Sequence, residues 1–134
     1  MWRKYCVGFL LPVLLLLVTG CAFQQSAFQK VAGNAGSEFA AAATTLSYAH
    51  EGKITSAYAA SSFVNYQSQL DGLDQTLPSQ QGAPDTHTVQ HLLALYKPAV
   101  QVIDHPCLDA SCSWRVQVDT LNRASKAFLE AGGS

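Results

Sequence analysis

The stretch that decides the fold class is FQKVAGNAGSEFAAAATTLSYAH, residues 28–50. Its apolar residues recur at steps of three or four, the period that places side chains on one face of an α-helix. We expect a first helix over about residues 25–50, with Gly52 as its stop. Gly33 and Gly36 each cost about 1 kcal/mol relative to alanine, so a frayed or kinked start, or a partial tether over residues 22–36, is the alternative. The recurring positions are Phe28, Val31, Ala35, Phe39, Ala42, Leu46 and Ala49.

A second segment with the same period predicts a helix over about residues 54–77. Its pattern ends at Pro78, which cannot continue a helix. The following run PSQQGAPD, residues 78–85, combines two prolines and a glycine with polar residues and predicts a loop. The expected core positions of this helix are Ala59, Phe63, Tyr66, Leu70, Leu73 and Leu77.

Two more helices are expected, over about residues 86–103 and 112–131. Asp85 or Thr86 can cap the first of them, and Pro98 inside its pattern is expected to kink it or split it near Lys97. Ser111 or Ser113 can cap the last helix, which Gly132 and Gly133 end. The expected apolar positions are Val89, Leu92, Tyr96, Ala99 and Ile103 in the first, then Trp114, Val118, Leu121, Ala124 and Phe128 in the second.

Four amphipathic helices with short connections predict an all-α fold, an antiparallel up-down-up-down four-helix bundle. Residues 21–134 are enough for one such domain and too few for two. In this arrangement Cys21, the loop at Pro78 and the carboxyl terminus lie at one end. The turn after His50 and the loop over residues 104–111 lie at the other.

The amino terminus has the pattern of an export signal. Arg3 and Lys4 precede a run of twelve residues, VGFLLPVLLLLV at 7–18, that carries no charge. As a helix this run would extend only about 18 Å, at about 1.5 Å per residue, against a hydrocarbon core of about 30 Å. It therefore fits the apolar region of a cleaved signal better than a permanent membrane span.

The sequence VTGC at residues 18–21, directly after this run, resembles the lipobox of bacterial lipoproteins. The resemblance implies that residues 1–20 are a lipoprotein signal peptide, that cleavage occurs before Cys21, and that the Cys21 sulfur carries a diacylglycerol. It also implies a protein anchored in a bacterial membrane on the extracytoplasmic side, at the periplasmic or outer-membrane face in a Gram-negative cell. Two or three acyl chains anchor far more firmly than the single chain that gives reversible binding. Ala22 stands where many lipoproteins retained at the inner membrane have Asp, which is permissive for the outer membrane.

The remaining cysteines form a pair. Cys6 lies in the signal and Cys21 is assigned to lipid, which leaves Cys107 and Cys112. In an oxidising compartment these two are expected to form a disulfide. The spacing, without a second cysteine pair nearby, suits a zinc site poorly.

The charge excludes one class of partner. After residue 20 the chain has nine acidic and six basic residues, a net charge of about −3 with histidine neutral. Nucleic-acid binding needs clustered positive charge, so no nucleic acid is expected as a partner.

Four histidines suggest a metal site as an alternative function. His87 and His91 are four residues apart and would share one helix face, the spacing that brings two imidazoles to one ion, but no carboxylate on that face completes the set. His50 and His105 belong to the two connections expected at the same end of the bundle. Solvated histidines are the simpler interpretation of both pairs.

No catalytic motif is recognisable: there is no G-x-S-x-G elbow, no placed pair of carboxylates and no C-x-x-C-H haem motif. We therefore expect no cofactor and no enzymatic activity. The favoured function is a membrane-anchored envelope lipoprotein that binds another envelope protein or a small ligand. The alternative is a metal-binding or metal-sensing bundle that uses the histidines.

Overall fold

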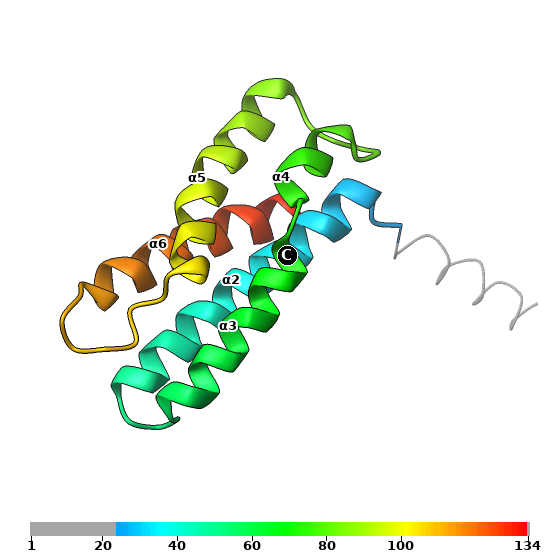
Figure 1. Ribbon diagram of the computed structural model, residues 1–134. Helices are drawn as coiled ribbons and strands as arrows, with labels where there is room; N and C mark the ends of the chain where they lie inside the picture. The colour runs from blue at the N-terminus through cyan, green and yellow to red at the C-terminus, as the bar shows by residue number, and fades with distance from the viewer. Residues whose placement is uncertain (1–23, 134) are drawn as a thin grey trace, which may run out of the picture.

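The computed structural model describes residues 24–133, and this part of the chain contains helices and no strand. Four long helices account for most of it, with two short helical turns between the second and third (Figure 1). The predicted all-helical fold is confirmed. The predicted signal over residues 1–20 and the lipidated Cys21 lie outside the described residues. The elements are α2 (Ala27–His50), α3 (Ser56–Leu70), α4 (Leu73–Thr76), the 3-10 turn η2 (Leu77–Ser79), α5 (Thr86–Asp104) and α6 (Trp114–Ala131).

Helix α2 begins with a capping box. Ser26 Oγ accepts a hydrogen bond from the backbone N–H of Gln29 (3.2 Å), and the Gln29 side chain accepts one from the backbone N–H of Ser26 (3.0 Å). The helix ends at His50, and Gly52 follows with a φ of 71°, a left-handed conformation that glycine adopts without strain. The expected single helix over about 25–50 agrees with α2, and a tether that continues to residue 36 is wrong, because residues 27–36 are helical.

The two glycines of α2 are a contact surface for α6. A Cβ on Gly36 would lie 2.8 Å from the backbone nitrogen of Leu129, so the two helices approach closely here. The buried hydroxyl of Ser125 donates a hydrogen bond of 2.8 Å to the Gly36 carbonyl across the same contact. The helix is continuous through Gly33 and Gly36 because the packing of α6 offsets their low helix propensity.

The second predicted helix, over 54–77, is wrong in its length. Helix α3 stops at Leu70, because Asp71 has a ψ of 131° and Gly72 a φ of 71°, which turns the chain before α4. The apolar pattern nevertheless continues into the core, since Leu77 is buried and Leu73 packs against the buried cluster. The same apolar spacing therefore places these side chains in the core whether the segment is one continuous helix or two helices joined by a turn.

Helix α5 is continuous through Pro98, so the predicted split near Lys97 is wrong. Proline removes one backbone donor, which leaves the carbonyl of Ala94 without its helical partner. Both Ala94 and Pro98 are exposed, so water can solvate that carbonyl. At its start, the Asp85 side chain accepts a hydrogen bond from the backbone N–H of Thr88 (2.7 Å), as the predicted cap requires.

Helix α6 begins at Trp114, two residues later than the predicted boundary. Ser113 occupies the cap position, but its side chain makes no capping hydrogen bond, and Ser111 bonds to Asp109 instead. Neither serine therefore caps α6 through its side chain.

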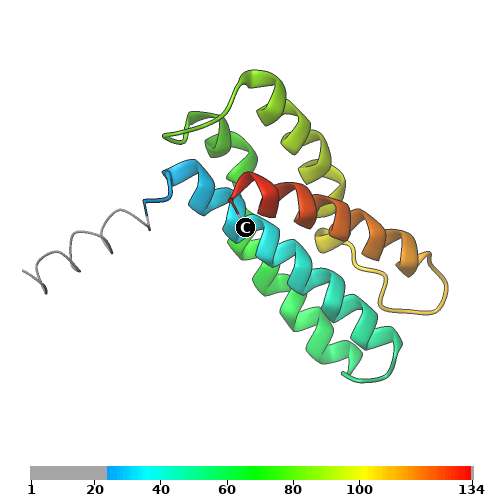
Figure 2. The same cartoon turned by 180° about the vertical axis from the view of Figure 1, so that it is seen from behind.

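The core lies between α2 and α6, the pair of helices with the most extensive contact, and α3 and α5 complete the ring of contacts (Figure 2). Phe39 meets the rings of Tyr96 and Phe128 edge to face, with centroids 6.0 Å and 5.6 Å apart. Four of the six aromatic residues expected in the core are buried: Phe39, Phe63, Tyr96 and Phe128. The other two, Tyr66 and Trp114, are half-buried.

Hydrogen bonds between distant segments define two ends of the described part of the chain. At one end the Phe28 N–H donates to the Gln81 carbonyl (3.0 Å), and the Gln25 side chain donates to the Gly132 carbonyl (3.3 Å). At the other end His50 contacts the loop of Cys107. We call these the amino-terminal end and the distal end of the molecule.

Candidate functional site

The distal end brings His50 together with the loop of Cys107 and Cys112, which the sequence also singled out. His50 is the last residue of α2, and its ring stacks on Trp114, the first residue of α6, with centroids 4.5 Å apart and planes 6° from parallel. Its Nε2 lies 2.6 Å from the Cys107 carbonyl oxygen. Because the carbonyl can only accept, this bond requires the proton on Nε2. His50 therefore ties the end of α2 to both the disulfide loop and α6.

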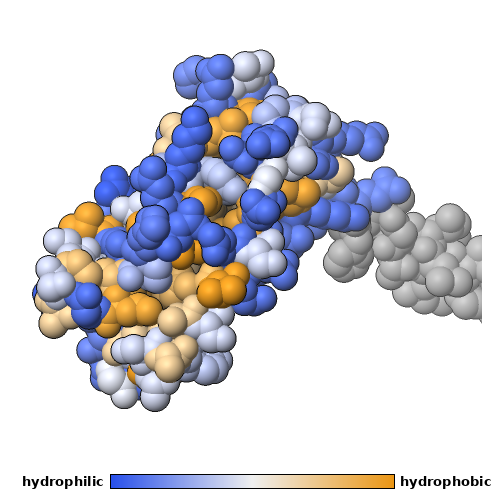
Figure 3. Space-filling model, viewed as in Figure 1, coloured by the Kyte–Doolittle hydropathy of each residue, from blue (hydrophilic) through white to orange (hydrophobic). Residues whose placement is uncertain are grey.

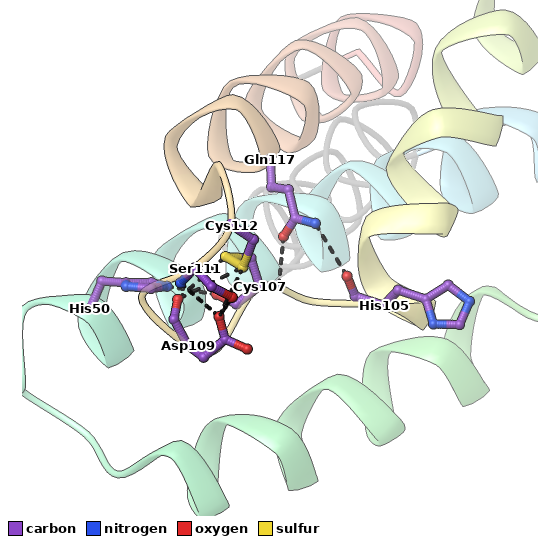
Figure 4. Close-up of a disulfide and its surroundings, with 7 residues drawn as sticks. All are labelled: His50, His105, Cys107, Asp109, Ser111, Cys112 and Gln117. Carbon is purple, nitrogen blue, oxygen red and sulfur yellow. Dashed lines mark hydrogen bonds between the residues drawn. A yellow bond between two sulfur atoms is a disulfide. The ribbon is translucent and has the colours of Figure 1, made fainter.

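The disulfide loop joins α5 to α6. The sulfur atoms of Cys107 and Cys112 lie at disulfide-bonding distance, with Cα atoms 5.8 Å apart, as the sequence predicted. Cys107 is buried, whereas Cys112 is exposed at the tip of the molecule (Figure 4). The disulfide thus links the exposed end of the loop to a buried residue at its start.

Hydrogen bonds from Gln117 hold the base of this loop. The Gln117 Oε1 accepts from the Cys107 backbone N–H (2.7 Å), and its Nε2 donates to the His105 carbonyl (3.2 Å). One side chain of α6 therefore satisfies backbone groups on both sides of Pro106. The sequence analysis missed this residue, because an amide on a helix face gives no signal of its partner.

Asp109 organises the exposed tip of the loop. Its carboxylate accepts hydrogen bonds from the Ser111 hydroxyl and from the Ser111 backbone N–H (2.8 Å). These bonds lower the pKa of Asp109, and the nearby His50 acts in the same direction. The carboxylate is exposed and keeps its charge, so the tip of the loop is acidic.

The same loop contains a group of potential metal ligands within the described part of the chain. The Sγ atoms of Cys107 and Cys112 and a carboxylate oxygen of Asp109 lie within 4.8 Å of one another. A closed disulfide has no thiolate to donate to a metal. Metal binding here would therefore require the reduced pair.

The four predicted histidines do not come together. Figure 4 shows His105 pointing away from the disulfide loop, on the side opposite His50. His87 and His91 are exposed on the first turns of α5. The loop of Cys107 follows the opposite end of this helix. Their neighbour Asp85 is engaged as the helix cap, as its lowered pKa from the Thr88 hydrogen bonds indicates. The structure therefore places the four histidines at three separate locations.

A second polar feature, missed by the sequence analysis, lies where α3 turns into α4. A hollow of about 310 Å³ opens there beside Tyr96, and the residues that line it include Asp71, Asp74 and Asp104. The Tyr96 hydroxyl donates a hydrogen bond of 2.6 Å to the Leu70 carbonyl at the end of α3. The Asp71–Gly72 dipeptide, a frequent turn sequence, is the signal that could have located this break.

The environment of Tyr96 defines its chemistry. Burial raises the pKa of Tyr96 to about 12, and the negative charges of Asp74 and Asp71 add to the effect. The phenol is therefore protonated at neutral pH and acts as a hydrogen-bond donor. Its hydrogen bond to Leu70 joins the end of α3 to α5.

The structure defines a helical domain with a stapled, acidic tip at its distal end. No protein-family model matches the chain, and comparisons with curated proteins and with solved structures found no match. No helix among residues 24–133 is long and apolar enough to cross a membrane.

Proposed function

We propose that the protein is a bacterial lipoprotein, attached through Cys21 to a membrane of the cell envelope on the extracytoplasmic side. The observation that carries the proposal is the sequence VTGC at residues 18–21, directly after a basic start and a short apolar run. The cap of α2 at Ser26 supports it, because only residues 22–25 separate Cys21 from the folded domain. At about 3.5 Å per residue, such a connection holds the domain within about 20 Å of the membrane surface.

In this proposal the four helices form an up-down-up-down bundle that stands on its amino-terminal end. Support comes from both ends of one helix pair: Gln25, just before α2, bonds to Gly132, and His50 stacks on Trp114. The loop at residues 80–83 belongs to the same end as Gln25, since Gln81 bonds to Phe28. The stapled tip at Cys112 then projects away from the membrane.

We infer a binding role for the domain, without enzymatic activity. The support comes from the distal tip, where a short exposed loop is held by one disulfide, by the His50 contact and by the Gln117 hydrogen bonds. A fixed loop loses little conformational entropy when a partner binds it. A second envelope protein or a small ligand is the expected partner, and the membrane is reached through the lipid.

The anchor is tested by expressing the full chain in a Gram-negative host with labelled palmitate. We expect label in the wild-type protein and its recovery with membranes, whereas Cys21→Ser carries no label. A matched control is Cys6→Ser, which changes a cysteine inside the signal and is expected to be labelled like the wild type. Label that persists in Cys21→Ser, or is absent from the wild type, refutes the proposal.

The metal-binding alternative is tested with the same purified protein. Elemental analysis after mild purification measures copper, zinc and iron per chain. A stoichiometric metal that is lost in His87→Ala/His91→Ala or in His50→Ala would favour the alternative. A metal content far below one per chain is the result expected from the binding role proposed above.

A further inference from the structure

The loop between Cys107 and Cys112 places oxygen atoms directly against its own sulfur atoms. The Asp109 Oδ1 lies 3.5 Å from the Cys112 Sγ, and the Asp109 backbone carbonyl oxygen lies 3.5 Å from the Cys107 Sγ. The sulfurs of a closed disulfide carry no proton, so neither contact is a hydrogen bond. While the disulfide is closed, the carboxylate therefore gains nothing from the sulfurs beside it.

Other contacts hold this carboxylate and the buried cysteine in place. The Asp109 Oδ1 accepts hydrogen bonds from the Ser111 hydroxyl and from the Ser111 backbone N–H (2.8 Å). The Cys107 backbone N–H is bound by Gln117, whereas Cys112 is exposed. In Figure 3 the region of this loop, at the left as in Figure 1, has mixed hydropathy and no continuous hydrophobic patch. The loop therefore offers individual ligand atoms, and not an apolar docking surface.

We propose that the loop becomes a zinc site when its disulfide is reduced, with the sulfurs of Cys107 and Cys112 and the Asp109 carboxylate as ligands. The three ligand atoms already lie within 4.8 Å of one another. Zinc accepts both thiolate sulfur and carboxylate oxygen, whereas magnesium and calcium take oxygen ligands. The cysteine spacing alone suited zinc poorly, because it does not reveal that Asp109 lies beside both sulfurs. The site goes beyond the binding role proposed above and depends on neither the lipid anchor nor the histidines.

The distances in the loop are close to those of a tetrahedral zinc site. With Zn–S bonds of about 2.3 Å and a Zn–O bond of about 2.1 Å, sulfur and oxygen ligands lie about 3.6 Å apart. The observed distance between the Cys112 Sγ and the Asp109 Oδ1 is 3.5 Å. Two sulfur ligands lie about 3.8 Å apart, so the reduced sulfurs must separate by only about 1.7 Å. Rotation of the exposed Cys112 side chain supplies this separation, and water takes the fourth position on the exposed side.

The site forms in two chemical steps. A dithiol protein of the compartment supplies two electrons and two protons, the bond between the Cys107 and Cys112 sulfurs breaks, two thiols form, and the donor becomes a disulfide. The donor attacks the Cys112 sulfur, because Cys112 is the exposed member of the pair. Zinc then displaces both thiol protons, which pass to solvent. The Ser111 hydroxyl rotates away from the Asp109 oxygen, and the Ser111 N–H continues to hold the carboxylate.

The test compares the oxidised and reduced forms of the full chain, extracted and purified in detergent. Reduction uses a phosphine, which is removed under nitrogen before zinc is added and the excess is washed away. Elemental analysis is expected to find about one zinc per reduced chain and far less per oxidised chain, and reoxidation should release the metal. Equal zinc in the two forms, or no zinc in the reduced form, would overturn the proposal.

Variants of exposed residues identify the ligands. Cys112→Ser is expected to retain no zinc, and Asp109→Asn to bind zinc at least about tenfold more weakly than the wild type. The matched control is Asp119→Asn, which changes an exposed aspartate on α6 and should bind like the wild type. His87→Ala/His91→Ala should also bind like the wild type. Zinc that is lost with the two histidines and kept in Cys112→Ser contradicts the proposal.

X-ray absorption of the zinc-loaded wild type gives a measurement that does not depend on the folding of a variant. We expect two sulfur neighbours at about 2.3 Å and oxygen neighbours at about 2.0–2.2 Å. A zinc environment without sulfur would refute the assignment. Palmitate labelling of the same protein separates the two proposals, since a labelled chain that binds no zinc refutes only the zinc site, and an unlabelled chain that binds zinc refutes only the anchor.

Discussion

The close approach of α2 and α6 predicts opposite effects for two alanine substitutions three residues apart. In a free helix, Gly→Ala is favourable by about 1 kcal/mol at either position. At Gly33 the nearest atom to a new Cβ is the Cα of Gly132 at 3.9 Å, an ordinary contact, so Gly33→Ala is expected to be neutral or to stabilise by up to about 1 kcal/mol.

At Gly36 the same methyl group has no space. It would lie 2.8 Å from both the backbone nitrogen and the Cγ of Leu129, and the backbone atom cannot rotate away. The helices must separate there, which costs about 1–3 kcal/mol as overpacking and weakens the 2.8 Å hydrogen bond from Ser125, itself worth about 1 kcal/mol. After the propensity gain is subtracted, Gly36→Ala is expected to destabilise the domain by about 1–3 kcal/mol.

The assay is thermal unfolding of the purified protein, followed by circular dichroism at 222 nm. For a domain of this size 1 kcal/mol corresponds to about 4 °C, so Gly36→Ala should melt roughly 4–12 °C below the wild type, and Gly33→Ala at or above it. Gly33→Ala controls for helix propensity, because the two substitutions are chemically identical and lie on the same helix. A Gly36→Ala protein that melts with or above Gly33→Ala would refute the close-contact interpretation.

Two further predictions concern the polar contacts. His50→Ala removes the bond to the Cys107 carbonyl and the stack on Trp114, so we expect a loss of about 1–2 kcal/mol and a red-shifted emission of Trp114, the single tryptophan after residue 20. An unchanged emission spectrum would contradict the stacking. For Tyr96, whose pKa rises from 10.0 to about 12 on folding, the stabilising effect is fully present below pH 10 and is lost as the pH rises to about 12. Chemical unfolding from pH 10 to pH 12 should show a falling free energy of unfolding in the wild type, and a Tyr96→Phe protein should lack the part of this fall that Tyr96 causes. At pH 7 the Tyr96→Phe protein should be less stable than the wild type, because the Leu70 carbonyl loses its partner.

Periodicity predicted the positions of the long helices because burial enforces it. Phe28, Phe39 and Leu46 on α2 and Leu121 and Phe128 on α6 are all buried, as their spacing required. The helix ends were less predictable, because a cap depends on which serine or aspartate the local backbone can reach. Asp85 caps its helix as expected, whereas Ser111 is drawn to Asp109 and leaves α6 without a side-chain cap.

Some features could not be predicted because helix propensity says nothing of the packing partner. Gly36 looks unfavourable in an isolated helix, but glycine is the residue that fits there once α6 occupies the space that its missing side chain leaves. The turn at Gly72 was hidden for the opposite reason, since Leu73 and Leu77 reach the core from a broken helix as well as from a continuous one. Pairwise contacts between distant segments, such as Gln117 with Cys107, are not encoded in any local pattern.

The arrangement of contacts explains why α3 is the least firmly held of the four long helices. Helix α2 has α6 along its length, with small residues at one end and the His50 stack at the other, so the α2–α6 pair makes the most extensive contact in the domain. Helix α3 buries three side chains, and its end is held by the Tyr96 bond to Leu70. A helix of this length is marginal in isolation, so its order depends on burial of its faces. We therefore expect the amides of α3 to exchange with solvent faster than those of α2 and α6, which hydrogen exchange followed by mass spectrometry measures.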